Sequence, residues 1–204
     1  MKNIGAIVFD LGGVLVELSG VSTILNWSGL PMDEATLWQR WLTSPSVRAF
    51  ESGQIATDDF ADQIIVEMQL SVSRQQFLEA FAVWPKGLYP GVTALLNILR
   101  DRFTLACLSN TSELHWPRLM NEMGLASQLD HHFASHLMGK IKPDVECFEH
   151  MLQDLNLSAG QVLFFDDNII NVDGAKKVGI HAVKVNGIED VERSLKEFGL
   201  LPKS

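Results

Sequence analysis

The sequence has little positive charge. Its 204 residues carry 16 Lys and Arg against 25 Asp and Glu, a formal net charge of −9 at pH 7. Nucleic acids and anionic membrane surfaces select for Lys and Arg, so this balance argues against both as partners. A small anionic substrate stays compatible with it, provided that positive charge is concentrated locally.

Long hydrophobic segments and cysteines are also scarce. The longest apolar runs fall far below the roughly 20 residues that cross a bilayer. Asp10 interrupts the one candidate for a signal-peptide hydrophobic region. The two cysteines, Cys107 and Cys147, are too few for a disulfide framework. We therefore expect a cytoplasmic protein.

Several catalytic motifs are missing as well. The chain has no GK[ST] phosphate loop, no GxGxxG dinucleotide fingerprint and no GxSxG nucleophile elbow. His132 and His136 are four residues apart, but they flank an expected strand, so helical metal-ligand geometry does not apply. What the chain does have is 47% hydrophobic and 20% charged residues, which is typical of a globular protein. Its length predicts one domain, or a core domain with a modest insertion.

Strands and helices are expected to alternate over most of the chain. Short apolar, β-branched-rich runs predict strands over residues 4–9, 104–108, near 133, 162–165 and 181–185. Helical spacing of apolar residues predicts helices over 92–99, 112–123, 148–155, 171–178 and 191–198. Alternation of this kind predicts an α/β fold, with a Rossmann-like parallel sheet covered by helices on both faces.

The segment from about residue 19 to 84 differs, because its apolar residues recur only at helical spacing. One helix is expected near Pro31, one after Thr57 as N-cap, and one after Ser73, which forms a capping box with Gln76. The tryptophans of this segment fit the core of a small bundle better than a substrate platform. We therefore expect an inserted helical cap over 17–89, and an α/β core made of 1–16 and 90–204.

Polar residues follow three of the expected strands at the point where each ends. Asp10 ends the first strand, Ser109 and Asn110 follow another, and Asp166 and Asp167 follow a third. Parallel strands place their carboxyl ends at one edge of the sheet, which is where ligands bind in open α/β folds. An oxygen-only cluster of carboxylates suits a hard cation such as Mg²⁺ shared with a phosphate. Asp10 alone could equally be an ordinary solvated acid, and the other strand ends favour the functional interpretation.

Lys142 precedes an expected helix whose start is marked by Pro143 and Asp144. Taken alone, it would be read as an exposed cation. Together with the three strand ends, it is predicted to supply positive charge to the same pocket.

Four strings of this sequence, in order, resemble the four motifs of the haloacid dehalogenase-like hydrolase superfamily. They are FDLGGVL, LACLSNT, GKIKPDVECF and LFFDDNIINVDGAKKVGI, and they span essentially the whole chain. The helical insertion resembles the superfamily's small four-helix-type cap. Within the superfamily, the strings are most similar to the phosphatase branch, and there to the bacterial glucose-1-phosphate phosphatase group.

The resemblance implies a Mg²⁺-dependent phosphatase that acts on a small phosphorylated metabolite, such as a sugar 1-phosphate, through an aspartyl-phosphate. Asp10 would be the nucleophile, Ser109 and Asn110 would hold the phosphoryl group, and Lys142 would neutralise it. The implied metal site comprises Asp10, Asp166, Asp167 and the backbone carbonyl of Gly12.

One position departs from the pattern. Most phosphatases of this superfamily carry a second Asp two residues after the nucleophile, as general acid and base, and here that position is Gly12. Its loss predicts a strong preference for good leaving groups. Glu17, Glu51 and His115 are the candidate replacements. Two alternatives stay open: a haloacid dehalogenase that uses the same nucleophile without metal, and a catalytically silent protein that binds a phosphometabolite.

Overall fold

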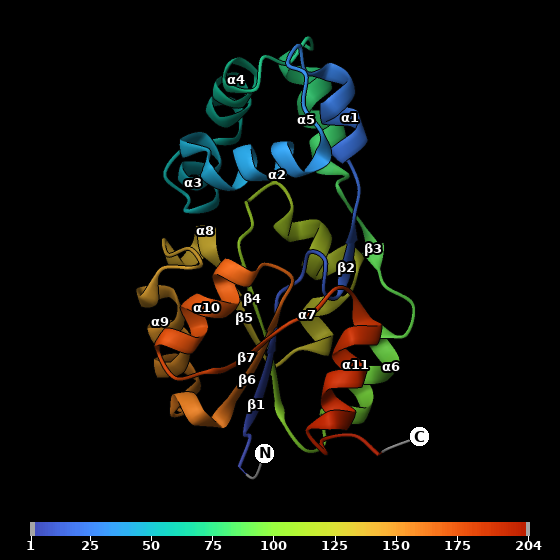
Figure 1. Cartoon of the computed structure of the whole chain (residues 1–204), viewed down its shortest axis with the longest axis vertical. Coiled ribbons are helices and arrows are strands. Elements are labelled where there is room, and N and C mark those ends of the chain that lie inside the picture. The colour runs from blue at the N-terminus through green and yellow to red at the C-terminus, as the bar shows by residue number, and fades with distance from the viewer. Residues whose placement is uncertain (1–2, 203–204) are drawn as a thin grey trace.

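The computed structural model describes residues 3–202 and contains a five-stranded parallel sheet. The strand order is β5-β4-β1-β6-β7 (Figure 1). The strands are β1 Ala6–Phe9, β4 Thr104–Ser109, β5 His131–Ala134, β6 Val162–Asp166 and β7 His181–Lys184. The predicted α/β fold with a parallel sheet is confirmed.

Strand β1 is buried on both faces because its side chains alternate between two cores. Ile7 and Phe9 lie in the core under helices α6 Val92–Leu99 and α11 Ile188–Glu197. Ala6 and Val8 lie in the core on the opposite face, under α9 Val145–Leu155 and α10 Ile169–Lys177. A central parallel strand with helices on both sides has this pattern. The remaining short elements of this body are η1 Arg118–Glu122, α7 Leu125–Gln128, α8 Ser135–Met138 and η2 Ala159–Gln161.

The helix predicted over 112–123 is wrong in extent and type. The segment begins with turns over residues 113–115, and helical geometry starts at residue 116 and continues as the five-residue π-helix η1. His115 precedes this helix, and its ring forms a hydrogen bond with the backbone carbonyl of Phe81. Leu119 and Met120 of this segment are buried.

A second, all-helical body lies beyond the carboxyl ends of the strands, with the start of β1 and the end of α11 at the other end of the molecule (Figure 1). Its helices are α1 Val21–Trp27, α2 Glu34–Thr43, α3 Pro45–Glu51, α4 Thr57–Glu67 and α5 Arg74–Ala82. Their apolar faces form a separate core with stacked aromatic rings, including Phe50 on Phe60 at 4.2 Å between ring centroids. Trp41 and Trp84 are buried in this core, as expected for bundle residues.

Two of the predicted helix starts can be checked directly. The capping box of Ser73 and Gln76 at the start of α5 is present. The N-cap predicted at Thr57 is wrong: Ala56 is the N-cap, and Thr57 is the first helical residue. The Thr57 hydroxyl instead donates to Glu113 Oε1 of the α/β body, at 2.6 Å.

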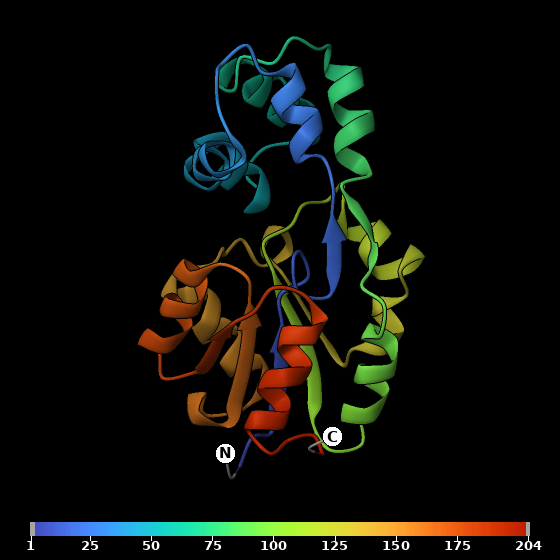
Figure 2. The same ribbon diagram turned by 45° about the vertical axis from the view of Figure 1, so that its right-hand side comes forward.

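The two bodies are joined by a two-stranded antiparallel ribbon that sequence analysis missed. It pairs β2 Val16–Leu18 with β3 Pro85–Leu88 (Figure 2). Each strand is too short to show an alternating pattern, and Pro85 and Gly87 are poor strand formers. Among the described residues, no helix is long and apolar enough to span a membrane.

Candidate active site

The candidate site lies at the carboxyl end of β1, where the order of the strands along the chain reverses. Chain order runs outward from β1 to β4 and β5 on one side, and then resumes on the other side with β6 and β7. Open α/β sheets bind ligands at such a switch point. Asp10 directly follows β1 there, and the Asp10 amide donates to the Phe165 carbonyl at 2.8 Å. The Asp10 side chain is only 12% exposed.

Lys142 bridges the ends of β1 and β6. Its Nζ lies 3.0 Å from Asp10 Oδ1 and 2.7 Å from Asp166 Oδ2, and its side chain is 1% exposed. Asn110 holds the Lys142 backbone at two points. The Asn110 amide nitrogen donates to the Lys142 carbonyl at 3.0 Å, and its side-chain oxygen accepts from the Lys142 amide at 2.9 Å. The predicted residues at positions 10, 110 and 142 therefore lie together, and the side chain of Asn110 positions Lys142.

Asp166 is completely buried and is bonded on several sides. Its Oδ1 accepts from the Asn168 amide at 2.8 Å, and the side-chain nitrogen of Asn171 lies 3.1 Å from both of its oxygens. Sequence analysis missed Asn171. Its place in the first turn of α10, five residues after the predicted ligand Asp166, is the signal that could have identified it.

Three carboxylates converge at this edge. One oxygen each of Asp10, Asp166 and Asp167 lies within 4.8 Å of the others. Burial raises the pKa of Asp10 to about 7; Lys142 opposes this rise, and the charges of Asp166 and Asp167 add to it. Burial and the Asp166 charge likewise raise the pKa of Asp167 to about 6. Crowded anions of this kind fit a hard divalent cation, which takes oxygen ligands and relieves their repulsion.

Lys142 is charged at this site. Burial alone would lower the pKa of Lys142, but Asp10 and Asp166 outweigh burial, and the net shift is upward. The site therefore offers a fixed ammonium group at neutral pH.

Two adjacent glycines shape the turn after Asp10. Gly13 has φ +70°, and a Cβ on it would lie 2.3 Å from Asp167 Oδ2, so only glycine fits beside that carboxylate. A Cβ on Gly12 would lie 2.9 Å from Leu18 Cδ1. A side chain at position 12 would therefore require Leu18, on the connecting ribbon, to shift.

Ser109 ends β4, the strand that pairs with β1 on the side away from β6. It is buried, at the same sheet edge as Asp10. Every residue predicted for the site is therefore at the carboxyl ends of β1, β4 and β6, or on the loop before α9.

A family model described as haloacid dehalogenase-like hydrolase matches residues 4–179. This is the superfamily that the four motifs resemble. A sesquiterpene phosphatase of Aspergillus oryzae is 29% identical over 188 residues, covering 86% of each chain. A D-ribitol-5-phosphate phosphatase of Bacteroides thetaiotaomicron is 24% identical, covering 93% of this chain and 95% of its own. Dehalogenases also match, at 23–24% identity.

The fold also matches a solved structure. It is a magnesium complex of the family enzyme bt-2542 from Bacteroides thetaiotaomicron, with a TM-score of 0.78 and 23% identity, covering 96% of this chain and all of the other. The phosphatase names among the relatives support a phosphoric monoester hydrolase.

Proposed function

We propose, because this chain belongs to the haloacid dehalogenase-like hydrolase family, that it is a Mg²⁺-dependent phosphatase acting on a small phosphorylated metabolite through an aspartyl-phosphate on Asp10. The observation that carries the proposal is the buried cluster in which Lys142 contacts both Asp10 and Asp166, with Asp167 beside them.

In the first step, a carboxylate oxygen of Asp10 attacks phosphorus. An acyl-phosphate bond forms, the ester P–O bond breaks, and its electron pair leaves with the alcohol oxygen. Carboxylate attack divides one difficult displacement into two easier ones. Asp10 must be ionised to attack, and Lys142 favours the ionised form.

The surrounding groups hold and neutralise the phosphoryl group. We assign Ser109 and Asn110 to phosphoryl binding, and Lys142 to the charge that develops during transfer. Mg²⁺ would be held by Asp10, Asp166, Asp167 and the Gly12 carbonyl. It would supply two positive charges at the site, whereas a charged side chain such as Lys142 supplies one. In the second step, water attacks phosphorus, the acyl-phosphate bond breaks, and inorganic phosphate leaves with Asp10 restored.

The dehalogenase alternative uses the same nucleophile on carbon and needs no metal. Placing two further carboxylates beside the nucleophile costs free energy, because burial and the crowding of the acids raise the pKa values of Asp10 and Asp167. A metal-free reaction does not need the two further carboxylates, so the site favours the phosphatase. The silent binding protein is supported only by Gly12.

For the substrate we propose a sugar phosphate, such as a sugar 1-phosphate, selected by an inserted cap over residues 17–89. The separate aromatic core of α1–α5 and the ribbon β2–β3 support this division. The ends of the ribbon would then be the hinges of the cap. Cys107 and Cys147 are free and buried, which supports a cytoplasmic location.

The test is hydrolysis of p-nitrophenyl phosphate, with Mg²⁺ and with EDTA, by the wild type and Asp10→Asn. We expect turnover by the wild type in Mg²⁺ alone. Full activity in EDTA, or in the folded Asp10→Asn variant, would refute the mechanism.

A further inference from the structure

The site needs a proton donor for the leaving oxygen, and the turn after β1 does not supply one. Position 12 is glycine, and a Cβ there would lie 2.9 Å from Leu18 Cδ1. A general acid contributes about 10²- to 10⁴-fold in rate. Either this chain forgoes that factor, or another element provides the acid.

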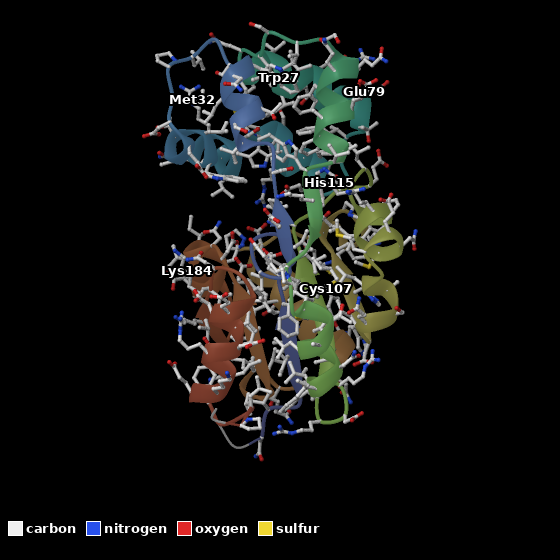
Figure 3. All side chains as sticks on the ribbon, turned by 90° about the vertical axis from the view of Figure 1, so that its right-hand side faces the viewer. Trp27, Met32, Glu79, Cys107, His115 and Lys184 are labelled. Carbon is white, nitrogen blue, oxygen red and sulfur yellow. The ribbon has the colours of Figure 1, made fainter. Side chains whose placement is uncertain are left out.

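Two of the three candidate general acids, Glu17 and His115, have polar partners outside the cluster of Asp10, Lys142 and Asp166. Glu17 is exposed on β2, where its Oε1 lies 2.7 Å from Lys86 Nζ. The ring of His115, which Figure 3 labels, is partly buried. Its Nε2 lies 2.7 Å from the Phe81 carbonyl, so this nitrogen donates its proton there. Burial lowers the pKa of His115 to about 4, so the ring is neutral and has no proton to spare at neutral pH.

Glu51 has a different position. It is the last residue of α3, the helix of the second body that packs against α8 of the α/β body. Arg48 of the same helix forms an ion pair with Asp144, two residues after Lys142. Just beyond the helix, Gly53 approaches the His136 carbonyl so closely that a Cβ would lie 2.5 Å from that oxygen. The carboxyl end of α3 is therefore held beside the loop that carries Lys142 (Figure 1).

The electrostatics of Glu51 link it to the catalytic cluster. Its side chain is half-buried, and the charges of Asp10 and Lys142 both act on it. Burial first, and then Asp10, raise the pKa of Glu51 to about 7, while Lys142 opposes the rise. A carboxyl group with this pKa is substantially protonated at neutral pH, which is the condition for a general acid and base.

We propose that Glu51 of α3 is the proton donor that replaces the missing acid at position 12. The inference rests on the proposed phosphatase function. As the ester P–O bond breaks, its electron pair goes to the leaving oxygen, which takes the proton of the Glu51 carboxyl group. The Glu51 carboxylate then takes a proton from the water that attacks the phosphorus of the aspartyl-phosphate, and both groups are restored.

With this assignment, the proton donor of the reaction belongs to the helical body. The nucleophile would be fixed at the sheet edge, and the acid would arrive with α3. Phosphoryl transfer from an alkyl ester to Asp10 would then need α3 seated against α8, because only there can Glu51 protonate the leaving oxygen.

The experiment compares kcat/KM across aryl and alkyl phosphates of graded leaving-group acidity, for the wild type and Glu51→Gln. Glu51→Gln keeps the shape of the side chain and removes the proton. Glu17→Gln is the matched control, because it makes the same change at an exposed, ion-paired site outside the cluster. Glu51→Asp retains the acid with a shorter reach.

We expect Glu51→Gln to lose about 10²-fold or more on alkyl and sugar phosphates. On p-nitrophenyl phosphate, whose leaving group needs no proton, we expect less than about tenfold, so the leaving-group dependence steepens. Glu51→Asp should restore part of the alkyl rate, and Glu17→Gln should match the wild type.

An equal loss across the whole series would assign Glu51 to binding or packing and overturn the inference. An unchanged series would overturn it too. Absence of Mg²⁺-dependent hydrolysis in both the wild type and Glu17→Gln would instead refute the proposed function, and this inference with it.

Discussion

The sheet edge and the helical body are built from different interactions. At the sheet edge, the buried ammonium of Lys142 lies 3.0 Å from Asp10 and 2.7 Å from Asp166, and a third carboxylate, Asp167, lies beside them. The helical body has an apolar aromatic core, and its polar contacts with the α/β body include the exposed pairs Arg48–Asp144 and Thr57–Glu113. Exposed pairs of this kind contribute little free energy.

The difference indicates that the sheet edge and the helical body have different roles in catalysis. A buried ion cluster is preorganised, and removing its cation, Lys142, would leave the neighbouring carboxylates uncompensated. Contacts that are individually weak can break and re-form during a catalytic cycle. We therefore expect large effects from changes at the sheet edge, and graded, substrate-dependent effects from changes in the helical body.

The largest expected effect is at Asp10. Asp10→Asn removes the nucleophile, and turnover should fall to the background rate, while the stability of the metal-free protein should rise because a buried charge is lost. Activity assays and thermal melts in EDTA check both. Asp173→Asn, an exposed acid on α10, is the control and should change neither.

The next effect concerns metal affinity. Asp167→Asn removes one of the three converging carboxylates, so the Mg²⁺ concentration for half-maximal activity should rise at least tenfold, since loss of even indirect support to metal ligands costs about 10- to 100-fold. Titration with Mg²⁺ measures it. An unchanged requirement would exclude Asp167 from the metal site.

The sheet edge could be predicted from sequence because its signal is local. Apolar runs that stop at Asp10, Ser109 and Asp166 mark strand ends, and parallel strands bring such ends together. The ribbon and its Leu18 could not be predicted, because Val16–Leu18 has only three residues and Pro85–Leu88 contains Pro and Gly, which are poor strand formers. Glu51 could be named but not favoured, since its environment depends on how the second body packs.

The free energy of unfolding of the metal-free protein should depend on pH. In the metal-free protein, the pKa values of Asp10, Asp167 and Glu51 lie above those of unfolded carboxyl groups. The native state then binds more protons than the unfolded state between about pH 4 and 7, so stability should fall as pH rises through that window. The lowered pKa of His115, about 4, opposes this trend only up to about pH 6.5.

Thermal melts in EDTA from pH 5 to 8 check this prediction, and Mg²⁺ should raise the melting temperature more at pH 8 than at pH 5. A melting temperature that rises with pH in EDTA would contradict the crowding of carboxylates at the sheet edge.

The smallest expected effect is at the contact between the bodies. Arg48→Ala removes an exposed ion pair worth no more than about 1 kcal/mol, so KM for a sugar phosphate should rise less than about fivefold. Hydrolysis of p-nitrophenyl phosphate should be unaffected. A loss on both substrates of the size expected for Asp10→Asn would mean that the two regions do not divide the work in this way.

The most direct test of the central claim, that Asp10 forms a covalent intermediate, is the stereochemical course at phosphorus. A phosphorothioate ester made chiral with oxygen isotopes is hydrolysed in water that carries the third isotope. Two successive in-line displacements, first by Asp10 and then by water, predict overall retention of configuration. Inversion would show a single displacement by water and contradict the account.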